Sequence, residues 1–187
     1  MSFTKLRIWI LVSLVLLSVS LTAYGQVTVI LTRHAEKAST PPKDPPLTQA
    51  GQQRAALLAS MLADSGVDAI YVTEFQRTQQ TAAPLAERVQ VKPTMIPAAD
   101  TDTLVKAIRA RQNGVVVVVG HSNTVPGIIA ALGGPKVQID DSDYNNLFVL
   151  TVGASHSPLL RLHYGDASAV PIPNGSMRDM QGRTPKM

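Results

Sequence analysis

The chain has 187 residues and a formal net charge of +4, a length that suits one domain with a sizeable core. Lys5 and Arg7 are the only charged residues among the first 25, and without that segment 15 basic residues face 13 acidic ones. This near-neutral balance, with no basic run or basic–aromatic patch, argues against nucleic-acid binding. The chain contains no cysteine, which excludes disulfides, thiolate catalysis and cysteine-based zinc sites.

The first 25 residues have the pattern of an export signal. Lys5 and Arg7 precede an apolar run of 16 residues from Ile8 to Ala23, and Ala23-Tyr24-Gly25 offers small residues for signal peptidase cleavage. The run is shorter than the ~20 residues of a membrane-spanning helix. We therefore expect residues 1–25 to be a signal peptide and the mature chain to be periplasmic or secreted, without a membrane span. An uncleaved anchor is the alternative.

The rest of the chain alternates predicted strands with predicted helices. Strands are expected at 27–32, 68–72, 91–96, 115–119, 147–152 and 159–163. Helices are expected at about 48–66, 76–88, 100–112 and 125–132. This alternation predicts an α/β fold, a three-layer α/β/α sandwich around a mostly parallel sheet. We expect one domain over 26–164 and a loosely ordered tail over 165–187, which has few large apolar residues.

Arginine and histidine residues follow three of the predicted strands. Arg33 and His34 come directly after the first strand, Arg77 comes shortly after the strand at 68–72, and His121 follows the five-valine strand. The carboxyl ends of parallel strands meet at one edge of the sheet, where open α/β sheets bind their ligands. Guanidinium groups suit bidentate phosphate recognition, and histidine is titratable near neutral pH. The sequence therefore predicts an anion site with a nucleophile or base at this edge.

Four sequence blocks resemble the histidine phosphatase superfamily, also called phosphoglycerate mutase-like. They are RHAEK at 33–37, LTQAGQQRA at 47–55, YVTEFQRTQQTAAPLA at 71–86 and VGHSNT at 119–124. Their order and spacing match the family through about residue 135, and Ala35 is a departure because glycine is usual there. The resemblance implies a phosphoglycerate mutase-like fold with His34 as the nucleophile that becomes phosphohistidine. It also implies that Arg33, Arg77 and His121 complete the phosphate pocket, with no cofactor and no metal.

The general acid is less clearly marked. In the superfamily it is often a carboxylate in the segment after the third strand, where Asp100 is the best match and Asp102 the next. Glu36 is a rival because it is close to His34 in sequence, and Glu74 ranks below it. We take Asp100 as the predicted acid.

Two further positions are open to more than one interpretation. Arg54 could reach the pocket or lie on a solvated helix face, and we favour the solvated face. Tyr144 could line the cleft, but a turn explains it as well.

The resemblance, together with these site residues, implies a metal-independent phosphatase that hydrolyses a phosphomonoester or phosphoramidate through phosphohistidine on His34. The segment between Ile96 and Val115 has room for one helix only, so we expect an open pocket, roofed at most by the loop 41–46. An open pocket favours hydrolysis over mutase chemistry, which must keep water from the phosphoenzyme. A non-catalytic phosphate-binding module and a phosphomutase are the alternatives. The expected partner is a phosphorylated small molecule or envelope component, and activity should fall as His34 protonates near pH ~6.5.

Overall fold

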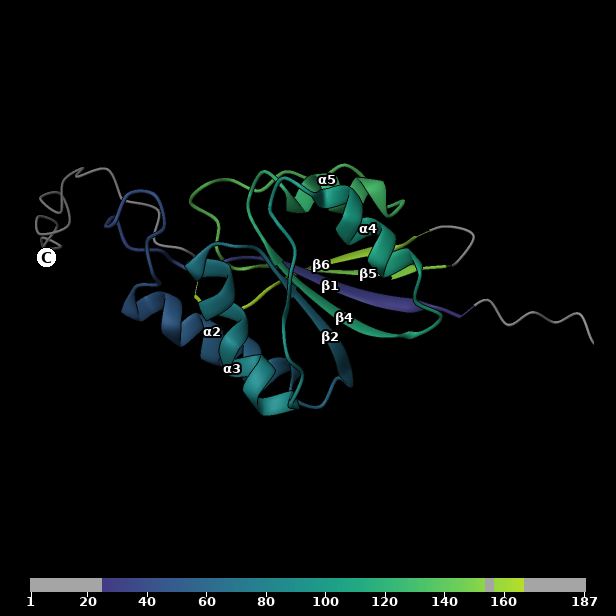
Figure 1. Cartoon of the computed structure of the whole chain (residues 1–187), viewed down its shortest axis with the longest axis horizontal. Coiled ribbons are helices and arrows are strands. Elements are labelled where there is room, and N and C mark those ends of the chain that lie inside the picture. The colour runs from purple at the N-terminus through teal and green to yellow at the C-terminus, as the bar shows by residue number, and fades with distance from the viewer. Residues whose placement is uncertain (1–24, 154–156, 167–187) are drawn as a thin grey trace, which may run out of the picture.

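The computed structural model describes residues 25–153 and 157–166 (Figure 1). Along these ranges the elements are β1 Val27–Arg33, α2 Gln49–Leu62, β2 Val67–Val72, α3 Gln76–Val89, β3 Thr94–Met95, α4 Thr101–Arg109, β4 Gly114–Gly120, α5 Val125–Ala131, β5 Asn146–Val152 and β6 Leu159–His163. The predicted signal peptide lies outside the described residues except for Gly25, and so does the predicted tail except for Gly165 and Asp166. None of the helices in the described ranges has the length and apolar character that crossing a membrane requires.

The strands form one mixed sheet of six in the order β3-β2-β4-β1-β5-β6. β1, β2, β3 and β4 are parallel, and β5 runs antiparallel to both β1 and β6. β1 and β4 pair without a break from Val27 opposite Gly114 to Arg33 opposite Gly120. The two strands therefore end at the same level, and the residues that follow them emerge side by side.

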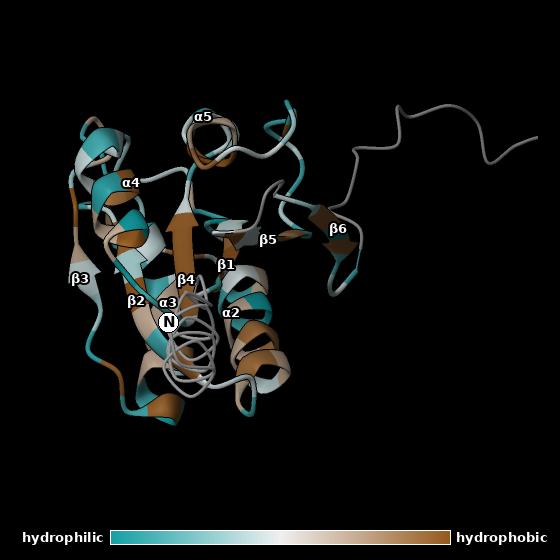
Figure 2. Ribbon diagram, turned by 90° about the vertical axis from the view of Figure 1, so that its right-hand side faces the viewer, coloured by the Kyte–Doolittle hydropathy of each residue, from teal (hydrophilic) through white to brown (hydrophobic). Residues whose placement is uncertain are grey.

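Helices cover both faces of this sheet. Figure 1 shows α4 and α5 on one face and α2 and α3 on the other. Figure 2 shows hydrophobic residues along β4, which lies between these two helix layers. The predicted three-layer α/β/α sandwich with a mostly parallel sheet is confirmed.

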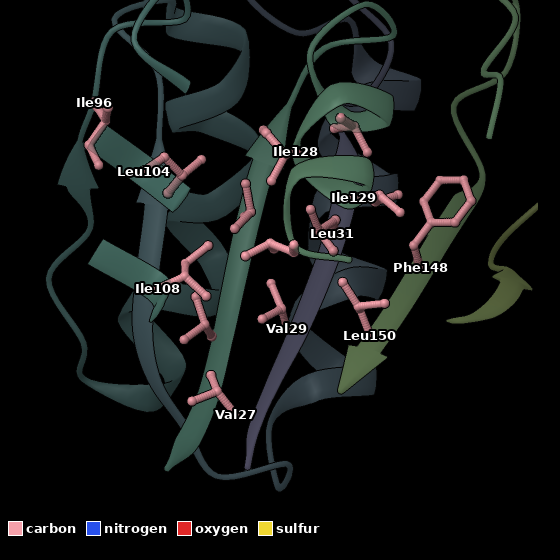
Figure 3. Close-up of a cluster of buried hydrophobic side chains, with 14 residues drawn as sticks. Val27, Val29, Leu31, Ile96, Leu104, Ile108, Ile128, Ile129, Phe148 and Leu150 are labelled. Atoms are coloured by element: carbon pink, nitrogen blue, oxygen red, sulfur yellow. The ribbon is translucent and has the colours of Figure 1, made fainter. Parts of the chain in front are cut away.

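A hydrophobic core lies on each face of the sheet, and alternate residues of the central strands point into one core or the other. Val29 and Leu31 of β1 point into the core under α4 and α5, which Figure 3 shows in close-up. Ile30, between them, belongs to the core under α2 and α3. Because successive side chains of a strand point to opposite faces, only an uninterrupted apolar strand can serve both cores. The apolar runs of β1 and β4 meet that requirement.

The strand predicted at 91–96 is much shorter in the structure, where β3 is only Thr94–Met95. Pro93 has no backbone N–H to donate to a sheet ladder, so pairing cannot extend back through it. β3 lies at the edge of the sheet beside β2. The chain then leaves the edge of the sheet and enters α4 at Thr101.

The sequence analysis favoured a solvated face of α2 for Arg54, and this prediction is wrong. The Arg54 side chain is buried, with Nε and Nη2 donating to the carboxylate of Glu36 at 2.9 and 2.7 Å. Nη1 donates to the Tyr164 carbonyl at 2.7 Å, and Nη2 to the Asp166 carbonyl at 3.0 Å. Arg54 thus joins the loop after β1 and the chain after β6 to α2. These partners are distant in sequence, which is why the helix pattern alone could not reveal them.

Replacing Arg54 should destabilise the fold. The variant Arg54→Met keeps the length of the side chain but leaves the Glu36 carboxylate, whose side chain is 20% exposed, without its cation. Removing one partner of such a pair leaves an uncompensated charge, so we expect a loss on the order of 3 kcal/mol in the free energy of unfolding by urea denaturation. Arg88→Met is the matched control, because exposed Arg88 bonds the Ser60 hydroxyl alone among the residues described, and its loss should cost less than about 0.5 kcal/mol. Equal stability of the two variants would contradict the structural role of Arg54.

Candidate active site

The central strands bring His34 and His121 together. The amide of His34 donates to the Gly120 carbonyl at 2.9 Å, which extends the pairing of β1 and β4 by one step. The two imidazole rings then lie 5.4 Å apart between centroids, at an angle of 64°. Both side chains are largely buried, with 3% and 7% exposure. The structure thus places both histidines predicted from the sequence in one site.

The rings open into a cavity of about 820 Å³ at the carboxyl ends of the strands. It is lined by Arg33, His34, Lys37, Phe75, Arg77, Ala98, Ala99, His121, Ser122, Asn123, Thr124, Asp141 and Tyr144. Four of the five predicted site residues are therefore brought together, namely Arg33, His34, Arg77 and His121. Tyr144 also lines the cavity, and Lys37 and Asp141 are lining residues that the sequence analysis missed.

The hydrogen bonding of His34 leaves one ring nitrogen free for chemistry. Its Nδ1 lies 2.8 Å from the Ala35 carbonyl oxygen, which can only accept, so Nδ1 carries the proton and Nε2 keeps its lone pair. Burial lowers the pKa of His34 from 6.5 to about 3, opposed by the Ala35 hydrogen bond and assisted by the positive charge of Arg33. His34 is therefore uncharged at neutral pH. Its protonation is expected far below pH ~6.5, the value assumed from the sequence.

His121 is also uncharged in the free site. Its Nε2 lies 3.1 Å from the Thr73 hydroxyl, and its amide donates to the Thr124 hydroxyl at 3.0 Å. Burial lowers its pKa from 6.5 to about 4, and the charge of Arg77 lowers it further in the same direction. A bound anion would favour the protonated ring, which could then donate to an anionic oxygen.

Arg33 is held by the segment that precedes β5. Its Nη1 donates to the carbonyls of Asp140, Asp141 and Asp143 at 3.2, 2.8 and 3.1 Å. Its guanidinium carbon lies 4.1 Å from the centre of the Tyr144 ring. The side chain is only 4% exposed, and its Nε has no hydrogen-bond partner within the described ranges. That nitrogen remains as a donor for an anion.

Arg77 lies in the first turn of α3, the helix that follows β2. Its guanidinium carbon lies 4.2 Å from the centre of the Phe75 ring, and its Nη1 is 3.9 Å from the Asp44 carboxylate. Asp44 also accepts from the Gln76 amide at 2.9 Å, so the proline-rich loop is tied to the start of α3 beside the cavity. The buried Nε of Arg77 lacks a hydrogen-bond partner among the residues described, as the Nε of Arg33 does.

None of the acids predicted from the sequence lines the cavity. Asp100, the predicted general acid, caps α4 instead, where its Oδ1 accepts from the Thr103 amide at 3.1 Å. Asp102 lies exposed in the first turn of the same helix. Glu36 is paired with Arg54, and Glu74 accepts from the Ala98 amide at 2.8 Å. The helix-capping preference of aspartate explains the position of Asp100.

A sequence model of the histidine phosphatase superfamily (branch 1) matches residues 29–100. The match agrees with the expected superfamily over 72 of the 187 residues. The matched segment contains Arg33, His34 and Arg77, and His121 joins them through the pairing of β4 with β1. No curated protein matches the chain in sequence.

Solved structures of phosphatases share the fold of this chain. The protein histidine phosphatase SixA complexed with tungstate has a TM-score of 0.62 at 18% identity, over 73% of this chain and 96% of that one. Phosphoserine phosphatase from Entamoeba histolytica with 3-phosphoglyceric acid has a TM-score of 0.58 at 16% identity, over 74% and 98%. A mycobacterial glucosyl-3-phosphoglycerate phosphatase has a TM-score of 0.56 at 14% identity, over 75% and 100%. These likenesses establish the fold and are too distant to transfer a substrate.

The arrangement suits transfer of a phosphoryl group. It combines an uncharged imidazole with a free nitrogen, a second imidazole and two guanidinium groups around one cavity. Transfer of a phosphoryl group needs a positioned nucleophile and fixed positive donors for the phosphoryl oxygens. Within the described ranges no group of three or more histidine, aspartate or glutamate side chains could hold a metal ion.

The two histidines should resist protonation in mildly acidic solution. In NMR spectra of the free protein, the ring C–H resonances of His34 and His121 can be assigned with the variants His34→Asn and His121→Asn. Both resonances should keep the chemical shifts of the neutral ring from pH 8 to pH 5, because burial lowers both pKa values. The unfolded chain takes up protons below about pH 6.5 while the folded rings do not, so the free energy of unfolding should fall as the pH falls from 6.5. This fall should be shallower in His34→Asn. Titration midpoints near 6.5 for both rings would contradict the buried site.

Proposed function

We propose that the chain is a phosphatase that transfers the phosphoryl group of a phosphomonoester or phosphoramidate first to His34 and then to water. The observation that carries the proposal is the His34 ring, which keeps Nε2 free and uncharged in the cavity shared with His121 and two arginines. A non-catalytic phosphate-binding module would not need a nucleophile prepared in this way.

In the first step the lone pair of His34 Nε2 attacks phosphorus, and the bond to the leaving group breaks. The ring becomes positively charged, and its Nδ1–H remains on the Ala35 carbonyl, which stabilises that charge. The unpartnered Nε groups of Arg33 and Arg77 would donate to the phosphoryl oxygens, over which negative charge spreads. Water then attacks phosphorus, and the bonding electrons return to Nε2.

The open cavity supports hydrolysis rather than mutase chemistry. Between β3 and β4 the chain has only α4, whose Leu104 and Ile108 pack into the core. Asp141 at the rim has a side chain that is 89% exposed, so water has access to that side of the cavity. A mutase must exclude water from its phosphoenzyme, and nothing comparable to a long lid lies between these strands.

The proposed substrate is a phosphorylated small molecule or an envelope component. The cavity is much larger than a phosphate group, and its rim carries Lys37 as well as Asp141, so part of the leaving group could be held there. The structural neighbours act, by their names, on phosphoproteins, phosphoserine and a sugar phosphoglycerate. A panel of phosphomonoesters and phosphoramidates would identify the preferred class.

The nucleophile can be tested by trapping the intermediate. After brief incubation with radiolabelled substrate and quenching, the wild-type chain should carry acid-labile, alkali-stable phosphate on His34. His34→Asn should carry none and should lose at least about 10³-fold in turnover, because the nucleophile is gone. His163→Asn, on the exposed edge strand β6, is the matched control and should label normally. An unlabelled wild-type chain, together with full turnover by His34→Asn, would refute His34 as the nucleophile, whereas a wild-type chain that binds phosphate without any turnover would favour the binding module.

We further propose that residues 1–25 direct export of the phosphatase. Expressed as the full chain in a Gram-negative bacterium, the protein should fractionate with the periplasm and begin near Gln26 by N-terminal sequencing. Lys5→Glu combined with Arg7→Glu should leave an uncut precursor in the cytoplasm, because a signal peptide needs a positively charged start. An uncut wild-type chain in the membrane fraction would instead support the anchor alternative.

A further inference from the structure

The proposed reaction lacks a proton donor among the carboxylates considered so far. A poor leaving group departs as an alkoxide unless an acid protonates it as the bond to phosphorus breaks. The carboxylates of Glu36, Glu74 and Asp100 each have another partner and do not line the cavity. A donor must lie at the cavity wall, so the remaining lining residues decide the question.

Asp141 supplies a carboxylate at that wall. It is the one acidic residue among those that line the cavity in the described part of the chain. Its Oδ1 accepts from the Ser122 hydroxyl at 2.6 Å, and Ser122 directly follows His121. The same Oδ1 lies 3.9 Å from Nη2 of Arg33, whose Nη1 holds the Asp141 carbonyl at 2.8 Å. Both the backbone and the side chain of Asp141 are thus positioned by residues of the phosphate site.

We propose that Asp141 is the general acid and base of this phosphatase, an inference that rests on the function proposed above. In the first step the Asp141 carboxyl group gives its proton to the leaving-group oxygen as His34 Nε2 bonds to phosphorus. In the second step the Asp141 carboxylate takes a proton from the attacking water as the N–P bond breaks. The products are the alcohol and inorganic phosphate, and both Asp141 and His34 return to their starting forms.

The position of Asp141 fits this cycle. Its Oδ1 lies 3.9 Å from Nη2 of Arg33, so a phosphate held by Arg33 would lie close to this carboxyl group. The leaving group departs with that proton, and the carboxylate that remains can accept a proton from water. The 89% exposure of the side chain gives that water access.

The two neighbouring aspartates are placed differently. The Asp140 carboxylate accepts from the Ser142 amide at 2.8 Å and from its hydroxyl at 2.6 Å, which holds the Asp140 pKa below its usual range. Asp140 and Asp143 line an adjacent cavity of about 520 Å³ rather than the one with the histidines. The backbone carbonyl of Asp143, like that of Asp141, accepts a hydrogen bond from Arg33. Asp143→Asn is therefore a closely matched control.

The test compares Asp141→Asn with Asp143→Asn in the full chain on two kinds of substrate. For an alkyl phosphomonoester, whose leaving group needs a proton, Asp141→Asn should lower kcat/KM by about 10²–10⁴-fold. For p-nitrophenyl phosphate, whose leaving group needs none, kcat/KM should fall by less than about 10-fold, and phosphorylated His34 should accumulate because the base is missing. Asp143→Asn should behave as wild type on both. Ser122→Ala should show the same dependence on leaving group in weaker form, since it removes only the hydrogen bond.

Equal losses on both substrates, or none on either, would overturn the role of Asp141. A structural role would lower both activities alike, whereas an acid changes the dependence on the leaving group. If Asp141→Asn does not fold, the same comparison of the two substrates with Ser122→Ala tests the role of Asp141. A wild-type chain that neither turns over substrate nor forms phosphohistidine would instead refute the proposed function itself. The two failures are therefore distinguishable.

Discussion

The site depends on the parallel pairing of β1 with β4. These strands are in register to their last residues, and the bond from the His34 amide to the Gly120 carbonyl adds one more step. Two residues far apart in the sequence therefore leave the sheet next to each other. Because a shift of one residue in a strand turns every side chain to the opposite face, the buried alternation of β1 and β4 fixes this register strongly. The hydrophobic cores thus set the distance between His34 and His121.

The loops around the strand ends then fix the orientation of the side chains. The Ala35 amide donates to the Thr81 hydroxyl of α3 at 2.9 Å, and the Glu36 carbonyl accepts from the Thr48 amide at the start of α2. These bonds hold the Ala35 carbonyl, which in turn selects the tautomer of His34. Gly51 is required at this contact, because a Cβ there would come within 2.3 Å of the Glu36 carbonyl oxygen. Both helices of this layer therefore help to orient His34, the proposed nucleophile.

Much of this could be read from the sequence, because the informative residues follow buried strands directly. The apolar runs predict β1 and β4, and Arg33, His34 and His121 come immediately after them. What could not be predicted depends on contacts between distant segments. Arg54 finds Glu36 and two carbonyls beyond β6, and Asp141 reaches the cavity from a polar segment that has no periodicity of its own. Asp100 was misplaced because the same residue type both caps helices and serves as an acid.

The central claim is that His34, His121, Arg33 and Arg77 surround one tetrahedral anion. The most direct measurement is a crystal structure of the protein soaked with orthovanadate, a mimic of the five-coordinate phosphorus of the transition state. We expect vanadium bonded to Nε2 of His34, with its oxygens within hydrogen-bond distance of both guanidinium groups and of the His121 ring. Vanadate bound elsewhere, or rings of His34 and His121 that turn into separate cavities, would contradict the account.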